Sequence, residues 1–374
     1  MRSSNHWLSR RVVAGAAAGA LAVGIGVAAP GTSANGAPIN FGVPNRYDVH
    51  KLVADEPGQA EIPDGNLLNS FGIASSDTSA LWVSDNHTGV ATLYHGGIDG
   101  SPVTRDPLVV TIPGGSPTGQ TFNPTQDFGL SADHSNPAIF IFADEAGQIS
   151  GWNPHVDPTQ SVVKASDPKA IYKGLTLASS PHGNRLYAAN FSENRIDVFD
   201  SQFVPVSLPR RAFTDPFVPR GFAPFNVQTI GDRIFVSFAK QNAEKQDEVD
   251  GNGLGFVDAF TTDGALVWRA FPHEVFNAPW GMVMAPASFG RFAGALLVGN
   301  FGNGLIHAFD PRTGLLLGLL RDGYDRPVDL PNLWALRVGN TNFGGTDAVV
   351  FSAGPGDEEH GLIGTLTPEV EPPA

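Results

Sequence analysis

Short apolar runs alternate with clusters of Gly, Pro, Asn and Asp along most of the chain, from Phe71 to Leu366. Apolar runs of this length that are bounded by turn residues are typical of β-strands. Beyond the N-terminal segment, no long window repeats its apolar residues with the 3.6-residue period of an amphipathic helix. The pattern therefore predicts an all-β protein with almost no helix.

One phrase recurs along these strands. An aromatic residue or Leu followed by a small residue opens an apolar strand, and a second and a third strand follow. The phrase returns at intervals of about 50 residues, which is the period of propeller blades rather than of helical solenoids. The six openings are Phe71-Gly72-Ile73, Phe128-Gly129-Leu130, Leu175-Thr176-Leu177, Phe225-Asn226-Val227, Trp280-Gly281-Met282 and Trp334-Ala335-Leu336. They predict six blades, with Phe128–Ala132 as the inner strand of the second blade and Arg210–Phe213 as the fourth strand of the third.

The last repeat contains only three strands, of which the final one is Gly361–Leu366. The segment Arg46–Val53, near the other end of the chain, has no neighbouring strand in sequence. We expect it to supply the missing strand, because a ring closed in this way leaves no exposed sheet edge. The predicted fold is a six-bladed β-propeller over residues 46–368, flanked by flexible segments at 35–45 and 369–374.

The first 34 residues have the composition of an export signal. Arg10 and Arg11 precede an Ala/Gly/Val-rich stretch, and Thr32-Ser33-Ala34 offers small residues for cleavage. The paired arginines resemble a twin-arginine signal, although an ordinary secretory signal remains the alternative. We therefore expect a secreted or extracytoplasmic protein that is not inserted in a membrane after cleavage.

Composition narrows the classes of ligand and of chemistry. The chain carries a formal net charge of −14, which disfavours nucleic acid and favours cations or neutral ligands. It contains no Cys, so disulfides, thiol nucleophiles and Cys-ligated zinc are excluded. It also lacks a G-x-S-x-G elbow and a phosphate-binding loop.

Three phrases carry a resemblance to a known family. They are Asn277-Ala278-Pro279-Trp280-Gly281, Val298-Gly299-Asn300-Phe301-Gly302-Asn303-Gly304 and Asp250-Gly251-Asn252-Gly253-Leu254-Gly255-Phe256-Val257-Asp258. With them the chain resembles a family of exported bacterial conserved hypothetical proteins with an NHL-like six-bladed propeller. The resemblance covers nearly the whole chain after the signal. It implies the fold and no particular reaction.

A candidate site follows from the geometry of propellers. Inner strands begin on the same face on which second strands end, so polar residues at both positions are expected to meet at the channel mouth. We predict a ligand-binding mouth formed by Asn69, Asp85, Asp127, Asp144, Glu145, Asn190, Asn226 and Asn300. Oxygen ligands of this kind suit Ca²⁺, for which Asp127, Asp144, Asn190 and Asn300 are the candidate metal ligands. The alternative is that each of these side chains caps a tight turn.

Two further features belong to the same region. We expect the repeated aromatic residues to pack between blades, with the following small residue facing the channel axis. Two acidic loops, Gln241–Leu254 and Gly354–His360, could bind calcium, cover the mouth as a lid, or remain solvated.

The favoured hypothesis is a monomeric binding or scaffolding protein that holds a small molecule, glycan or peptide at the channel mouth. The alternative is a calcium-dependent lactonase-like hydrolase, in which Lys173, Lys240 or Glu145 would assist protonation. The Glu-Gly-Pro opening of senescence-marker-type lactonases is missing. A quinone-dependent dehydrogenase is a third, weaker hypothesis, because the mouth offers only Lys173 and Lys240 to an anionic cofactor.

Overall fold

The computed structural model describes residues 42–369, which fall within one compact unit. The predicted export signal at 1–34, the first part of the flexible segment at 35–45 and the tail at 370–374 lie outside the described residues. Within the described part, strands alternate with turns, and the helical elements are two short 3-10 turns, η1 (His273–Val275) and η2 (Gly290–Phe292). In residues 42–369, no helix has the length and apolar character needed to cross a membrane.

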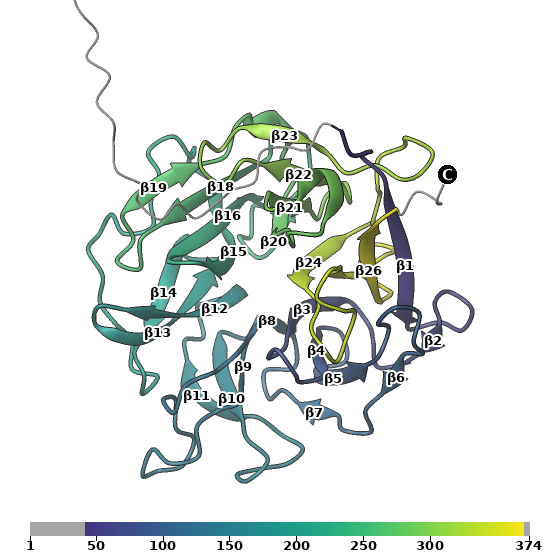
Figure 1. The fold of residues 1–374 in the computed structure, drawn as a ribbon. Helices are drawn as coiled ribbons and strands as arrows, with labels where there is room; N and C mark the ends of the chain where they lie inside the picture. Colours follow the sequence, from purple (N-terminus) through teal and green to yellow (C-terminus); the bar gives the residue numbers. More distant parts are fainter. Residues whose placement is uncertain (1–41, 370–374) are drawn as a thin grey trace, which may run out of the picture. The chain divides into compact units, whose positions relative to one another are not determined.

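Six sheets of mainly antiparallel strands surround a common centre in the described part of the chain, each with one edge strand innermost (Figure 1). This arrangement is the six-bladed β-propeller predicted from the repeats. The inner strands of neighbouring sheets contact one another around the whole ring.

The first five blades follow one another along the sequence. The first comprises β3 (Ser70–Ala74), β4 (Leu81–Asp85), β5 (Val90–His95), β6 (Thr104–Arg105) and β7 (Val110–Thr111). The second comprises β8 (Pro117–Phe122), β9 (Phe140–Asp144), β10 (Gln148–Trp152) and β11 (Val162–Ser166). The third comprises β12 (Tyr172–Ser180), β13 (Gly183–Asn190) and β14 (Arg195–Phe199). The fourth comprises β15 (Phe222–Ile230), β16 (Arg233–Gln241), β17 (Glu248–Val249), β18 (Gly255–Phe260) and β19 (Leu266–Arg269). The fifth comprises β20 (Pro279–Met284), β21 (Leu296–Asn300), β22 (Ile306–Phe309) and β23 (Leu316–Leu319).

The sixth blade combines strands from both ends of the described chain. From the axis outward, its first three strands are β24 (Leu333–Val338), β25 (Val349–Ala353) and β26 (Leu362–Pro368). The N-terminal strand β1 (Tyr47–Ala54) pairs antiparallel with β26, and the short β2 (Ile62–Pro63) lies parallel to β1. Both ends of the propeller are thereby held in one sheet.

Two strand predictions were wrong. The inner strand of the second blade is Pro117–Phe122 and not Phe128–Ala132. Phe128 is buried outside the strand and packs against Phe203, with the ring centroids 5.3 Å apart. The polar composition of Pro117–Phe122 explains why the hydrophobic pattern missed it. In the third blade, Arg210–Phe213 forms no strand, and only a bridge between Phe199 and Pro205 continues the sheet outward.

The six inner strands share a bulge. Each shows an irregular register against the second strand of its blade, and in the first, fourth, fifth and sixth blades it falls at the residue pair that opens the repeat. In the second and third blades it falls at Thr118-Gly119 and at Lys173. The small residue of the pair faces the next blade. A Cβ built on Gly72 would lie 2.3 Å from the carbonyl oxygen of Thr118, so only glycine lets these two inner strands approach so closely.

Four of the aromatic residues that open the repeats pack together on the axis, contrary to the expectation that they pack between blades; they are Phe71, Phe225, Trp280 and Trp334. The rings of Phe71 and Trp334 stack with centroids 3.5 Å apart, and Phe71 meets Trp280 edge-on at 5.3 Å. Phe71 and Trp280 belong to the first and fifth blades, which are not neighbours, so their contact crosses the centre of the ring. We call this buried group the axial plug; it consists of Phe71, Phe225, Trp280, Phe301 and Trp334.

Candidate functional site

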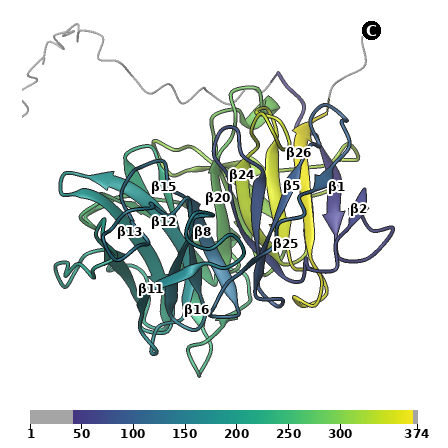
Figure 2. The same cartoon turned by 90° about the horizontal axis from the view of Figure 1, so that it is seen from below.

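The plug divides the axis into two ends of different chemistry. All inner strands begin at one end, which we call the covered end, and finish at the other, which we call the open end. In the view of Figure 2 the inner strands β20 and β24 run side by side, and the two strands are in contact. The predicted mouth corresponds to the covered end.

Lys173 is the centre of the covered end. It lies on β12 at the bulge position that aromatic residues occupy in other blades. Its side chain is 4% exposed, and its Nζ donates to Glu145 Oε1 at 2.5 Å and to Asp247 Oδ1 at 3.2 Å. Burial alone would lower the pKa of Lys173, but Glu145, Glu248 and Asp247 together raise it well above its ordinary value. The lysine is therefore held as a cation.

The two acidic loops meet above this lysine. Asp247 and Glu248 come from Gln241–Leu254, and Glu358 comes from Gly354–His360. Burial raises the pKa of Glu248 to about 8, with Lys173 opposing the rise and the charge of Glu358 adding to it. Loops from the fourth and sixth blades thus lie close enough for their charges to interact. We call the two segments together the acidic lid, and of the three alternatives for these loops the geometry favours this one.

A hydrogen-bond chain links the acidic lid to the axial plug. Asn69 donates from Nδ2 to Glu358 Oε2 at 2.6 Å and accepts at Oδ1 from Trp334 Nε1 at 2.7 Å. Trp280 Nε1 donates to the carbonyl oxygen of Lys173 at 3.1 Å. Asn69 and Glu145 are therefore the two predicted ligand-binding residues that the structure places in the covered-end cluster.

The other predicted strand-end residues bind the backbone and side chains around them. Asp85 accepts from Thr92 at 2.7 Å, and Asp144 accepts from the backbone NH of Gln148 at 2.9 Å. Burial raises the pKa of Asp85 well above its ordinary value and that of Asp144 to about 6. The remaining three donate as follows: Asn190 to Glu193 and Asp197, Asn226 to the carbonyl of Trp280, and Asn300 to the carbonyl of Val275. The contact of Asp144 matches the turn-capping alternative, whereas Asn226 and Asn300 bind backbone carbonyls distant in sequence.

Asp127 lies at the opposite end of the propeller from Asp144, and the prediction that both reach one mouth was wrong. Its carboxylate accepts from Asn184 at 2.8 Å, and Asn184 is the second residue of β13, next to the turn between β12 and β13. That turn lies where inner strands finish. The error follows from the wrong inner strand in the second blade. The proposed calcium ligands do not converge, and within residues 42–369 no three His, Asp or Glu side chains are arranged to hold a metal ion.

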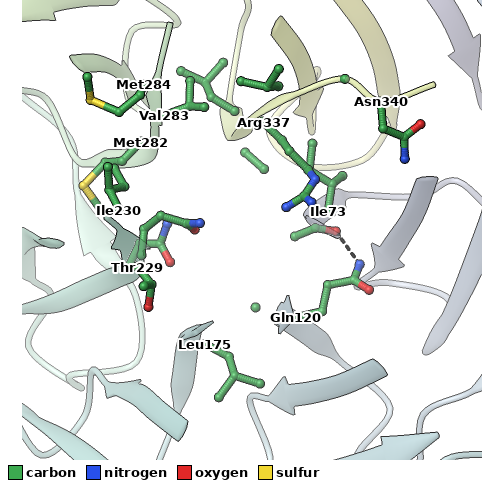
Figure 3. A pocket seen from close by; sticks show the side chains of 18 of the residues that line it. Ile73, Gln120, Leu175, Thr229, Ile230, Met282, Val283, Met284, Arg337 and Asn340 are labelled. Carbon is green, nitrogen blue, oxygen red and sulfur yellow. Dashed lines mark hydrogen bonds between the residues drawn. The ribbon is translucent and has the colours of Figure 1, made fainter. Parts of the chain in front are cut away.

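The open end contains a cavity of about 460 Å³ on the axis. Its walls are the last residues of the inner strands, chiefly Ile73, Leu175, Ile230, Met282 and Met284 (Figure 3). Its inner surface reaches Trp280 of the axial plug and the small bulge residues. These apolar side chains share the lining with polar residues, and most of them belong to strands already fixed in sheets.

Nine of the 22 residues that line this cavity are polar or charged. Gln120 is held by the backbone through its Nε2, which donates to the carbonyls of Gly72 at 2.8 Å and Trp82 at 3.1 Å, while its buried Oε1 has no partner. Arg337, on β24, extends toward the middle of the cavity in Figure 3. Sequence reasoning missed this site. The available signal was the alternation Trp280, Met282, Met284, which continues an axis-facing row with apolar residues beyond the aromatic one.

Comparisons with known proteins give the family and the fold. No family model matches the chain. An uncharacterized protein of Acanthamoeba polyphaga mimivirus, R648, is 29% identical over 86% of this chain and 80% of its own length. A second, L690, is 30% identical over 86% of this chain and 85% of its own length. A structural genomics protein of unknown function from Bacteroides thetaiotaomicron superposes with a TM-score of 0.52 at 12% identity, covering 86% of this chain and 76% of that one; this likeness supports the fold alone. The chain belongs to the family of the uncharacterized mimivirus protein L690.

Proposed function

We propose that this propeller is a binding protein that holds a small, largely apolar molecule in the axial cavity at the open end. The observation that carries the proposal is the cavity itself. Its volume of about 460 Å³ falls in the range of small-molecule sites, and its wall combines aliphatic and sulfur-containing side chains with nine polar or charged residues out of 22. The proposal keeps the predicted class of function and moves the ligand to the other end of the axis.

The cavity is built to remain open without a ligand. Ile73, Ile230 and Met282 lie on inner strands that are each paired with a second strand of the same blade. The axial plug closes the inner side with interlocked rings. A ligand would therefore lose little binding energy to reorganisation of the protein, and burial of its apolar surface would favour binding by about 25 cal/mol per Å².

The calcium-dependent hydrolase has less support from the geometry. Its proposed metal ligands are divided between the two ends, with Asp127 at one and Asp144 at the other. Lys173 and Glu145, two of its proposed proton donors, are engaged with each other beneath the acidic lid. The binding function needs no rearrangement of these groups.

Titration with a neutral, environment-sensitive apolar dye tests the proposal. We expect saturable binding to the wild type, with enhanced dye fluorescence. Met284→Trp should weaken this binding about tenfold or more, because the indole fills part of the cavity. The matched control is Leu315→Trp, since Leu315 is in the same blade but 57% exposed outside the cavity.

The folding of both variants is checked by circular dichroism and thermal melting. Quenching of tryptophan fluorescence by a brominated apolar compound gives a second measurement, because Trp280 lines the cavity. That quenching should decrease in Trp280→Phe. Non-saturable dye binding to the wild type, or equal affinity of Met284→Trp and wild type, would overturn the proposal.

A further inference from the structure

Arg337 is a cation fixed in position at the wall of the axial cavity. Its Nε donates to Ser75 Oγ at 2.9 Å, and its Nη2 donates to the backbone carbonyl of Ser75. Nε and Nη2 form one edge of the guanidinium plane, so Ser75 occupies that whole edge. The remaining edge, formed by Nη1 and the second hydrogen of Nη2, keeps its donors available.

Arg337 also lacks a carboxylate partner. Within residues 42–369, no Asp or Glu oxygen forms an ion pair with it at 4.0 Å or less. Other arginines of the propeller do have such partners: Arg269 is paired with Asp215, and Arg105 with Asp64. Burial lowers the pKa of Arg337, and the charge of Asp77 only partly opposes this effect. A partly dehydrated cation without a counter-charge is costly unless an anion meets it.

We propose that the ligand of the axial cavity carries one anionic group, a carboxylate, which accepts hydrogen bonds from the free edge of Arg337 while its apolar body contacts Met282, Met284 and Ile230. This inference rests on the proposed function. A carboxylate presents two oxygens in one plane, which matches two parallel N–H donors. A single charge also matches the one cation, whereas a dianion would leave one charge unpaired in a partly dry site.

Asp77 gives the site a second, opposing charge. It lines the rim of the cavity and is exposed, so water and salt screen its effect. A carboxylate ligand would be weakly repelled by it, and a cationic ligand would be attracted. Asp77→Asn is therefore expected to tighten carboxylate binding by about twofold at low salt and less at high salt.

Calorimetric titration with octanoate, octanamide and octylammonium at pH 7.5 tests the charge preference. These three probes share the chain and differ in the head group. We expect the wild type to bind octanoate about tenfold or more tightly than octanamide, and octylammonium most weakly. Arg337→Met should abolish the preference for octanoate, and Arg337→Lys should retain part of it. The control is Arg312→Met, because the Arg312 side chain is 65% exposed on a loop away from the cavity.

The outcomes separate the two proposals. If octanamide and octanoate bind equally and both displace the neutral dye, the anion preference is wrong and the proposed function stands. If none of the three probes binds and the dye does not saturate, the proposed function itself fails. Unchanged dye affinity in Arg337→Met shows that its cavity is intact. If Arg337→Met does not fold, Arg337→Lys and Asp77→Asn provide the test. An octanoate affinity equal to that of the wild type in both variants would overturn the proposal.

Discussion

The two ends of the propeller axis differ in what occupies the central channel. At the covered end, charged side chains fill the opening: Lys173 binds Glu145 and Asp247, and the acidic lid closes above them. At the open end the inner strands finish in apolar residues around a cavity of about 460 Å³, where Arg337 has no carboxylate partner. The covered end is closed by paired charges, whereas the open end keeps a cavity with an unpaired cation in its wall.

The difference teaches where to look for a site in a repeat protein. Strand-end Asp and Asn residues are numerous because turns need them. Asp144 and Asn300 each use one polar atom to hold the surrounding backbone and leave one buried oxygen without a partner. A charged group held in place with free hydrogen-bond capacity, as Arg337 is, carries more information than a larger number of acids. The following variants separate the two ends experimentally.

The largest effect is expected from Phe71→Ala, which removes part of the boundary between the ends. Phe71 is 1% exposed and contacts both Trp280 and Trp334, so its loss leaves a cavity in the axial plug. We expect the free energy of unfolding to fall by about 3–5 kcal/mol. Chemical denaturation measures this. Phe217→Ala is the control, because Phe217 is 71% exposed. A loss below about 1 kcal/mol would show that the plug is not a shared boundary.

A smaller effect, confined to the covered end, is expected from Lys173→Met. The variant leaves Glu145 and Asp247 without their cation, and the partial exposure of these acids, 30% and 62%, limits the penalty. We expect a loss of about 2 kcal/mol and faster proteolysis within the acidic lid. The affinity of the axial cavity for the neutral dye should not change. Lys169→Met, at an exposed lysine, is the control. Weakened dye binding in Lys173→Met would mean that the two ends are coupled.

The third effect depends on pH, and it is smallest near pH 5: a dependence of stability on pH that Glu248→Gln should remove. The pKa of Glu248 is about 8 in the folded protein against an ordinary value of 4.5. Between these values the unfolded chain has lost this proton and the folded protein has kept it, so stability falls as pH rises from about 5 to about 8. Denaturation midpoints of wild type and variant should therefore diverge across this window, with the variant gaining relative stability toward pH 8. If the denaturation midpoints of wild type and variant instead ran parallel with pH, the burial of Glu248 within the acidic lid would be contradicted.

Much of the architecture was predictable because it follows from local patterns. Turn residues and apolar alternation recur with every blade, so the number of blades and the strand near the N-terminus could be read directly. The inner strand at Pro117–Phe122 could not, since its Thr and Gln residues hide it from a hydrophobic pattern. The direction of the plug aromatics was also hidden, because alternation tells which residues face opposite ways but not which way each faces.

The candidate site was less predictable for a related reason. The bulge in each inner strand shifts the register, so aligning the third blade on Leu175 hid the equivalence of Lys173 with the plug aromatics. Asn69 and Glu145 were placed at the correct end because they adjoin strands that the pattern identified. Arg337 could not be singled out, since its importance depends on having no carboxylate within ion-pair distance, and only the folded chain determines its neighbours.

The pairing of β1 with β26 sets the order in which this protein can mature. During synthesis, Tyr47 leaves the ribosome long before its partner Pro368 has been made, so the first strand must wait for nearly the entire chain. Until then the propeller is not closed into a ring. The unpaired edge of β1 can meanwhile pair wrongly with strands of other chains. A premature stop that deletes only the final strand, β26, would thus remove the pairing partner of both β1 and β25 and leave the ring open.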